Sequence, residues 1–101
     1  MVKLNKEIVC KDGFIMSVQA NEGAYCYPRV DNAPSYKSVE VGFPSRLEPL
    51  LLDWADDPER PTGTVYGYVP VATILLVCAK HGGVISGELP PGIPALNVVT
   101  G

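Results

Sequence analysis

Tyrosine and arginine side chains gather in one short stretch of this chain, AYCYPRVD, at residues 24–31. A tyrosine ring offers a flat apolar face for a nucleobase and a hydroxyl for a hydrogen bond. The guanidinium of Arg29 is a planar fork that matches a phosphate group. Base stacking and phosphate neutralisation together are the chemistry of a nucleotide site. We therefore expect Tyr25, Tyr27 and Arg29 to contact such a ligand.

Five further residues fit the same kind of site. Lys11, at a predicted hairpin turn, supplies a second cation, and Ser17 and Gln19 share one face of a predicted strand, where they can recognise base edges. Tyr66 and Tyr68 alternate in TVYGYV, which predicts that both rings lie on one face of a strand. The structural alternative stays open, because strand tyrosines commonly serve cross-strand packing.

Arg29 also has a structural alternative. It follows a proline and lies two residues before Asp31, so a surface ion pair between the two would explain it without a ligand. The case for binding therefore depends on the joint presence of these residues rather than on any one of them.

Groups suited to catalysis are few. The chain has a single histidine, His81, and no nucleophile elbow. His81 ends a predicted helix, where a histidine commonly interacts with the terminal carbonyls. We predict no catalytic residue and no enzyme activity.

The three cysteines do not form a convincing metal site. Cys78 and His81 share a helix face, and Cys10 and Cys26 would have to complete the set. Structural zinc sites usually combine two closely spaced pairs, and only one is present. Small buried cysteines are the favoured interpretation, and we predict neither metal nor cofactor. The odd number also argues against a secreted disulfide framework.

Charge and hydropathy limit the partners. The formal net charge is −3 and basic residues form no run, so duplex nucleic acid is not an expected partner. The longest apolar run, VATILLVCA, is about half as long as a membrane span requires. The first residues lack a signal-peptide core. These patterns predict a cytoplasmic protein without membrane contact.

The hydrophobic pattern predicts one small α+β domain over residues 1–101, with a mostly antiparallel sheet and two helices. A hairpin turns at Asp12-Gly13, and an irregular stretch from Asn21 leads to the strand SVEVGF. A helix is predicted from Ser45, with a capping box to Glu48. The strand TVYGYV, a buried helix VATILLVCAKH that starts at Pro70, the strand VISGEL and a Pro-rich tail at 89–101 follow.

Four blocks between Cys10 and Gly83 resemble a family of small single-domain proteins of tailed bacteriophages: KDGFIMSVQANEGAYCYPR, VEVGFPS, DPERPTGTVYGYVPV and KHGG. The family is similar to counter-defence sponges of the anti-CBASS kind. Such proteins bind a host cyclic oligonucleotide immune signal without cleaving it.

The resemblance implies a sponge for a signal such as a cyclic dinucleotide, in the cytoplasm of the infected bacterial host. It also implies a homo-oligomer with ligand sites at or near subunit interfaces. It carries no residue-by-residue ligand list, so the site residues named above come from the side chains alone. The alternative is a small phage protein that inhibits or adapts a host protein by direct contact through exposed tyrosines and Arg29.

Overall fold

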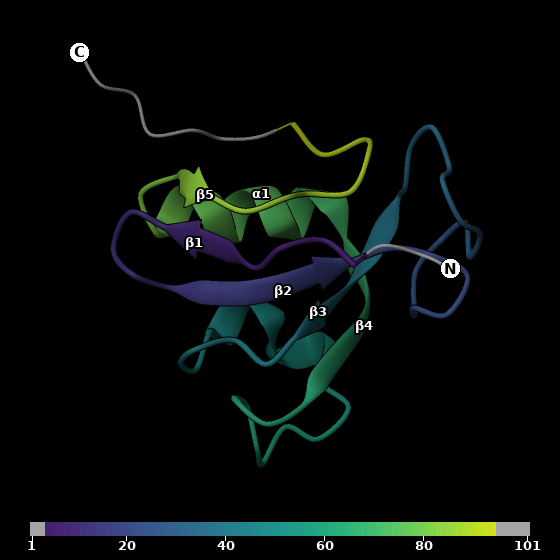
Figure 1. Ribbon diagram of the computed structural model, residues 1–101. Helices are drawn as coiled ribbons and strands as arrows, with labels where there is room; N and C mark the ends of the chain where they lie inside the picture. The colour runs from purple at the N-terminus through teal and green to yellow at the C-terminus, as the bar shows by residue number, and fades with distance from the viewer. Residues whose placement is uncertain (1–3, 95–101) are drawn as a thin grey trace.

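A hairpin begins the fold, as the Asp12-Gly13 pair predicts. In the computed structural model, which describes residues 4–94, β1 (Ile8–Cys10) pairs antiparallel with β2 (Ile15–Gln19) (Figure 1). Gly13 takes φ +92°, a conformation that L side chains rarely adopt. The Asp12 carboxylate accepts a hydrogen bond from the Phe14 amide at 2.9 Å and closes the turn.

Five strands form one antiparallel sheet in the order β4-β3-β2-β1-β5. β3 (Ser38–Gly42) pairs with β2 and with β4 (Val65–Pro70), and β5 (Val84–Ser86) pairs with β1. Helix α1 (Val71–Lys80) connects β4 to β5 at the opposite edge of the sheet. The predicted α+β class and the predicted order of strands and helices are confirmed.

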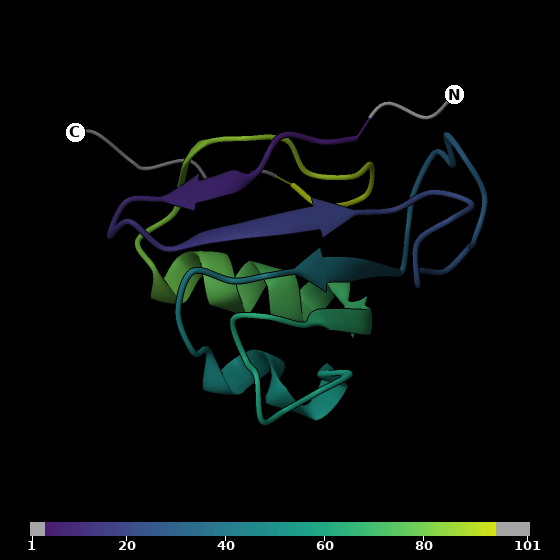
Figure 2. The same ribbon diagram turned by 60° about the horizontal axis from the view of Figure 1, so that its bottom comes forward.

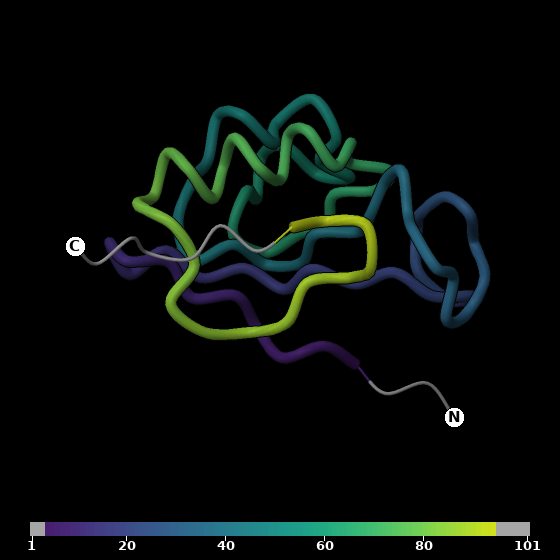
Figure 3. Tube along the Cα trace, turned by 90° about the horizontal axis from the view of Figure 1, so that it is seen from above, coloured from purple at the N-terminus to yellow at the C-terminus, as the bar shows by residue number. Residues whose placement is uncertain are grey.

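The core lies on one face of the sheet. Alternation along β2 buries Met16 and Val18 completely and leaves Ser17 and Gln19 half-buried on the other face, as predicted. Figure 3 shows α1 and the short helix η1 (Pro49–Trp54) on the same side of the strands. In the view of Figure 2, α1 lies partly behind β3 and η1 lies below β4. Within residues 4–94 no helix covers the second face.

The first helix differs from its prediction. It is a 3-10 helix, its N-cap is Glu48 rather than Ser45, and Pro49 occupies its first turn. The Glu48 carboxylate accepts a hydrogen bond from the Leu50 amide at 2.9 Å. Ser45 instead accepts a hydrogen bond from the Ile15 amide of β2 at 2.9 Å. The capping-box prediction was wrong because Pro49 fits the first turn but not a helix interior that would begin at Ser45.

The second helix buries one face only. Ile74, Val77 and Cys78 point into the core, whereas Leu76 is 59% exposed. Pro70 was predicted to be the first residue of this helix, but it is the last residue of β4 and the N-cap, so the helix begins one residue later, at Val71. The predicted buried helix is therefore covered on one face only, because a two-layer fold covers a helix on one side.

The described part of the Pro-rich tail packs back onto the domain. Pro91 accepts a hydrogen bond from the Tyr36 amide at 3.0 Å, and Ile93 is buried. Residues 95–101 of the predicted tail lie outside the described residues.

Across residues 4–94, no helix has the length and apolar character needed to cross a membrane.

Candidate functional site

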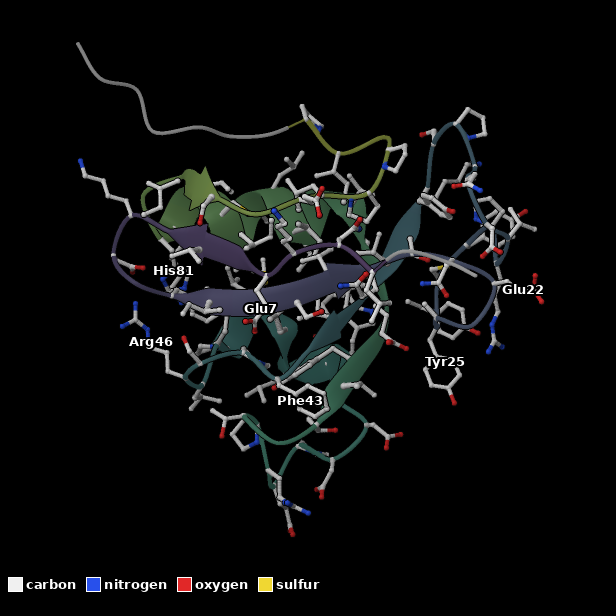
Figure 4. All side chains as sticks on the ribbon, in the orientation of Figure 1. Glu7, Glu22, Tyr25, Phe43, Arg46 and His81 are labelled. Atoms are coloured by element: carbon white, nitrogen blue, oxygen red, sulfur yellow. The ribbon has the colours of Figure 1, made fainter. Side chains whose placement is uncertain are left out.

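Three of the predicted site residues meet on one surface. The guanidinium carbon of Arg29 lies 5.1 Å from the ring centroid of Tyr25. The Tyr25 ring lies in turn 6.0 Å from that of Tyr68, with the rings tilted by 35°. Tyr25 is 46% exposed and Tyr68 is 49% exposed, so both rings present apolar surface to solvent. Figure 4 shows Tyr25 projecting outward beside the end of β4.

A β-bulge explains why Tyr68 points outward. Val41 pairs with Tyr66 and Val39 pairs with Val69, so Gly67 and Tyr68 together face the single residue Glu40. Tyr68 has φ +56°, a left-handed conformation that is uncommon for a bulky residue. Strained backbone of this kind is concentrated at functional sites.

The bulge also overturns the prediction that Tyr66 and Tyr68 share a face. Tyr66 is fully buried, and its hydroxyl donates a hydrogen bond to the Pro61 carbonyl. The extra residue in β4 reverses the alternation between the two tyrosines. Tyr66 therefore packs in the core and has no exposed ring face on which a base could stack.

A hollow of about 360 Å³ lies beside the two exposed rings. This volume is at the lower end of the range of roughly 300–1,000 Å³ that small-molecule sites occupy. Aromatic side chains and one carboxylate contribute most of its chemistry. Its lining residues come from the loop after β2, the end of η1 and β4: Tyr25, Trp54, Ala55, Asp56, Val65, Gly67 and Tyr68.

Backbone contacts hold Tyr25 in this position. Its amide donates to the Glu40 carboxylate at 3.0 Å, and its carbonyl accepts from the Tyr68 amide at 2.9 Å. Gly67 lies under its side chain, where an added Cβ would come within 3.1 Å of the Tyr25 Cβ. Tyr25 is thus fixed to both β3 and β4, which makes its ring a preformed part of the surface.

The irregular stretch from Asn21 is organised by buried polar groups. The Tyr36 hydroxyl donates to the Val30 carbonyl at 2.6 Å and accepts from the Ala33 amide at 3.2 Å. The Asn21 side chain accepts from the Gly23 amide at 2.8 Å. Because these bonds span the loop, they position Arg29 without a regular element.

Arg29 does not pair with Asp31. Its Nε donates to the Glu22 carbonyl at 3.1 Å, while the Asp31 carboxylate accepts from the Glu22 amide at 2.8 Å. Within residues 4–94 the terminal guanidinium nitrogens of Arg29 make no hydrogen bond and no ion pair. They are therefore available to an anion.

The remaining predicted residues lie apart from the hollow. Lys11 is exposed on the hairpin turn, at the opposite end of β2 from Tyr25 (Figures 1 and 4). Gln19 bonds the backbone of Asn5 through both its oxygen and its nitrogen, and it also donates to the Ser17 hydroxyl at 3.0 Å. Tyr27 is 60% exposed on the same loop as Arg29 but does not line the hollow.

Five of the seven lining residues are not among the predicted site residues, and two of these five, Trp54 and Asp56, carry side chains suited to binding. Trp54 follows the leucines of residues 47–51 at helical spacing, which indicates an apolar helix face, and Asp56 belongs to the stretch DDPERP, which is typical of a solvated turn. The available signal was the position of the only tryptophan immediately before a Pro-punctuated loop. Nothing in the spacing alone could show that this loop folds back along β4.

A second polar cluster surrounds His81, whose side chain is almost fully buried. Its Nδ1 lies 2.6 Å from the Asp12 carboxylate, and its Nε2 lies 2.7 Å from the Glu48 carboxylate. Arg46 also pairs with Asp12 at 2.6 Å, and Lys80 pairs with Glu48 at 2.9 Å. His81 uses its side chain to join these carboxylates, a role that the helix-end interpretation did not anticipate. Figure 4 shows Arg46 and His81 together, far from Tyr25.

The hydrogen bond from His81 is the main cause that lowers the pKa of Asp12. Burial raises the pKa of Glu48, but hydrogen bonds from Leu50, Lys80 and His81 outweigh burial and lower it overall. Both carboxylates are therefore ionised and fully paired. The cluster joins the hairpin turn, the start of η1 and the end of α1.

The cysteines are free thiols buried in the fold. Burial, with a smaller contribution from neighbouring Cys10, raises the pKa of Cys78 to about 12. Among the described residues, no group of three or more histidine, cysteine or acidic side chains could hold a metal ion.

Comparison with known proteins gives no match to a family model, a curated protein or a solved structure. The function is therefore inferred from the geometry of the site.

Proposed function

We propose that the chain is a non-catalytic binding protein that sequesters a cyclic oligonucleotide signal. The observation that supports this function is the exposed Tyr25–Tyr68 ring pair beside a hollow of about 360 Å³, with the Arg29 guanidinium over the first ring. Each base that stacks on an aromatic ring contributes about 1–3 kcal/mol to binding. The Arg29 guanidinium beside Tyr25 supplies the charge that a phosphate requires.

The resemblance to phage proteins makes the proposal more specific. A sponge in the cytoplasm of an infected bacterium has to bind its signal tightly, and it needs no catalytic group. Association into a homo-oligomer would let neighbouring subunits contact the two halves of a cyclic dinucleotide. Several large apolar side chains are available for such association because they are exposed: Leu4, Val30, Phe43, Leu47, Leu50, Leu76 and Ile85.

The test is a titration of the purified chain with cyclic di- and trinucleotides. Trp54 is the only tryptophan and lines the hollow, so its fluorescence reports occupancy directly. Ligand recovered after heat denaturation should be chemically intact. If no compound binds, sequestration is wrong, and cleaved ligand would identify an enzyme instead.

Arg29→Ala separates binding from folding. Loss of a charge-assisted contact should weaken affinity roughly tenfold or more. The free energy of unfolding should change by less than about 0.5 kcal/mol, because the residue is at the surface. Arg60→Ala is the matched control, since Arg60 is an exposed arginine that does not line the hollow.

A second candidate function is direct contact with a host protein. Phe43 and Leu47 are 58% and 52% exposed on the connection between β3 and η1, and the exposed Leu50 follows in the first turn of η1. Figure 4 shows Phe43 projecting from the face of the sheet opposite to the helices. Stoichiometric capture of one host protein by the parent chain but not by Phe43→Ser would support this function.

A further inference from the structure

The position of Asp56 is fixed by the edge of the sheet. Its amide donates to the Val65 carbonyl at 2.9 Å, and the preceding Ala55 forms an antiparallel bridge with Tyr66. The following residue, Asp57, donates its amide to the Thr64 hydroxyl at 3.0 Å. The backbone at Asp56 therefore runs alongside β4 instead of being part of a loose turn.

Asp56 is the one acidic residue that lines the hollow, together with the aromatic residues Tyr25, Trp54 and Tyr68. Across residues 4–94 it accepts no hydrogen bond and joins no ion pair. Neighbouring acids differ in this respect, because Asp57 accepts from the Glu59 amide and Glu40 accepts from the Tyr25 amide. An ionised carboxylate can only accept, so the hollow presents acceptor oxygens beside aromatic surface.

This combination defines the chemistry of a complementary ligand group. A phosphate would be repelled by the carboxylate and should lie on the Arg29 side of Tyr25. The group that enters the hollow has to be flat and aromatic, and it has to carry N–H donors on its edge. A nucleobase meets the first requirement, and the pattern of donors decides which base meets the second.

We propose that the hollow binds a guanine base and that Asp56 is the residue that selects it; this proposal rests on the function proposed above. The Watson–Crick edge of guanine carries two adjacent donors, the ring N1–H and the exocyclic amino group. Two carboxylate oxygens can accept from both donors at once. Bidentate pairs of this kind discriminate between bases more strongly than single hydrogen bonds.

The other bases match the carboxylate less well. Adenine and cytosine place a ring nitrogen acceptor beside their amino group, and that lone pair faces one carboxylate oxygen. Uracil offers one ring N–H between two carbonyl oxygens. Each therefore makes one hydrogen bond and brings an acceptor against the second carboxylate oxygen.

The experiment compares cyclic di-GMP, cyclic di-AMP and the mixed guanine–adenine cyclic dinucleotide by calorimetry on the full chain. The parent protein should bind the guanine-containing compounds most tightly. Asp56→Asn should reduce their affinity roughly ten- to hundredfold and leave the affinity for cyclic di-AMP within about twofold. Asp53→Asn is the matched control, because it removes a nearby exposed charge that does not line the hollow. It should change neither affinity.

The outcomes separate the two proposals. Equal affinities for guanine and adenine compounds, or an equal effect of Asp56→Asn on both, would overturn the role of Asp56 and leave sequestration in place. If the parent protein binds none of the compounds, sequestration and guanine selection are both wrong. A thermal unfolding curve for each variant shows whether it is folded under the conditions of the titration.

Discussion

The imidazole Nε2 of His81 lies 2.7 Å from Oε1 of Glu48, and both side chains are buried. The opposite ring nitrogen faces Asp12 at 2.6 Å. The Arg46 guanidinium also lies close to this second nitrogen, with Nη2 3.3 Å from Nδ1. His81 also stacks on Phe14, with ring centroids 4.1 Å apart, so the cluster is part of the core packing.

Glu48→Gln should strongly destabilise the fold. The amide would keep an acceptor for the Leu50 amide but would lose the charge that Lys80 and His81 require. Breaking a buried ion pair by removing one partner costs about 3–5 kcal/mol. Urea denaturation measures the loss, and Glu59→Gln, at an exposed acid outside the cluster, is the control. A loss below about 1 kcal/mol would show that the pairs contribute little.

Acid should unfold the chain through the same carboxylates. The pKa values of Asp12 and Glu48 lie below their ordinary values of 3.8 and 4.5, so the unfolded chain takes up these protons first. Their stabilisation is fully present above those ordinary values and is lost as the pH falls through the lower folded values. Melting temperatures between about pH 7 and about pH 2 should fall most steeply at the acid end. Asp12→Asn should flatten that decline; an unchanged slope would contradict the assignment.

The helices and strands could be predicted from the sequence where the local preference of the residues agrees with the contacts that they make in the folded chain. The turn at Asp12-Gly13 follows from the positive φ that Gly13 can adopt. The burial of Met16 and Val18 follows from the alternation of side chains along a strand that has one face in the core. The first helix was harder, because Ser45 and Glu48 form a valid capping pattern in sequence. In the structure both side chains make tertiary contacts instead of a capping box. Ser45 accepts a hydrogen bond from β2, and the Glu48 carboxylate pairs with His81 and Lys80.

Tyr66→Phe should lower stability without affecting ligand binding, whereas Tyr68→Gly should abolish binding with little effect on stability. Tyr66→Phe removes a buried hydroxyl that bonds the Pro61 carbonyl, which should cost about 1–2 kcal/mol in unfolding free energy without changing ligand affinity. Tyr68→Gly relieves a positive φ, so its stability should change little while ligand binding is lost. Denaturation and Trp54 fluorescence titration on both variants measure the two quantities. Retained binding by Tyr68→Gly would remove that ring from the site.

The thiols should be unreactive in the folded chain. Cys10, Cys26 and Cys78 are all buried, and the pKa of Cys78 is raised to about 12. Only a thiolate is a good nucleophile, so alkylation near pH 8 should be slow until urea is added. Mass spectrometry counts the modified cysteines in each state. Rapid labelling of the native chain would contradict the burial.

The candidate site was partly predictable. Residue types alone identified Tyr25, Arg29 and Tyr68, because exposed aromatic and guanidinium groups carry recognisable binding chemistry. The separation of Tyr66 from Tyr68 could not be predicted, since one extra residue in β4 reverses the strand alternation and no local signal marks it. Trp54 and Asp56 enter the site only because residues 55–56 pair with β4.

Gly67→Ala tests whether the position of Tyr25 matters for binding. The new Cβ would lie 3.1 Å from the Tyr25 Cβ, so the ring has to move by a few tenths of an ångström. Overpacking of this kind costs about 1 kcal/mol, partly offset by the lower entropy of alanine in the unfolded chain. Ligand affinity, measured by Trp54 fluorescence, should fall several-fold because the stacking surface is displaced. Gly63→Ala, with ordinary contacts to Arg60, is the matched control. Equal affinities for both variants would show that the ligand does not contact Tyr25.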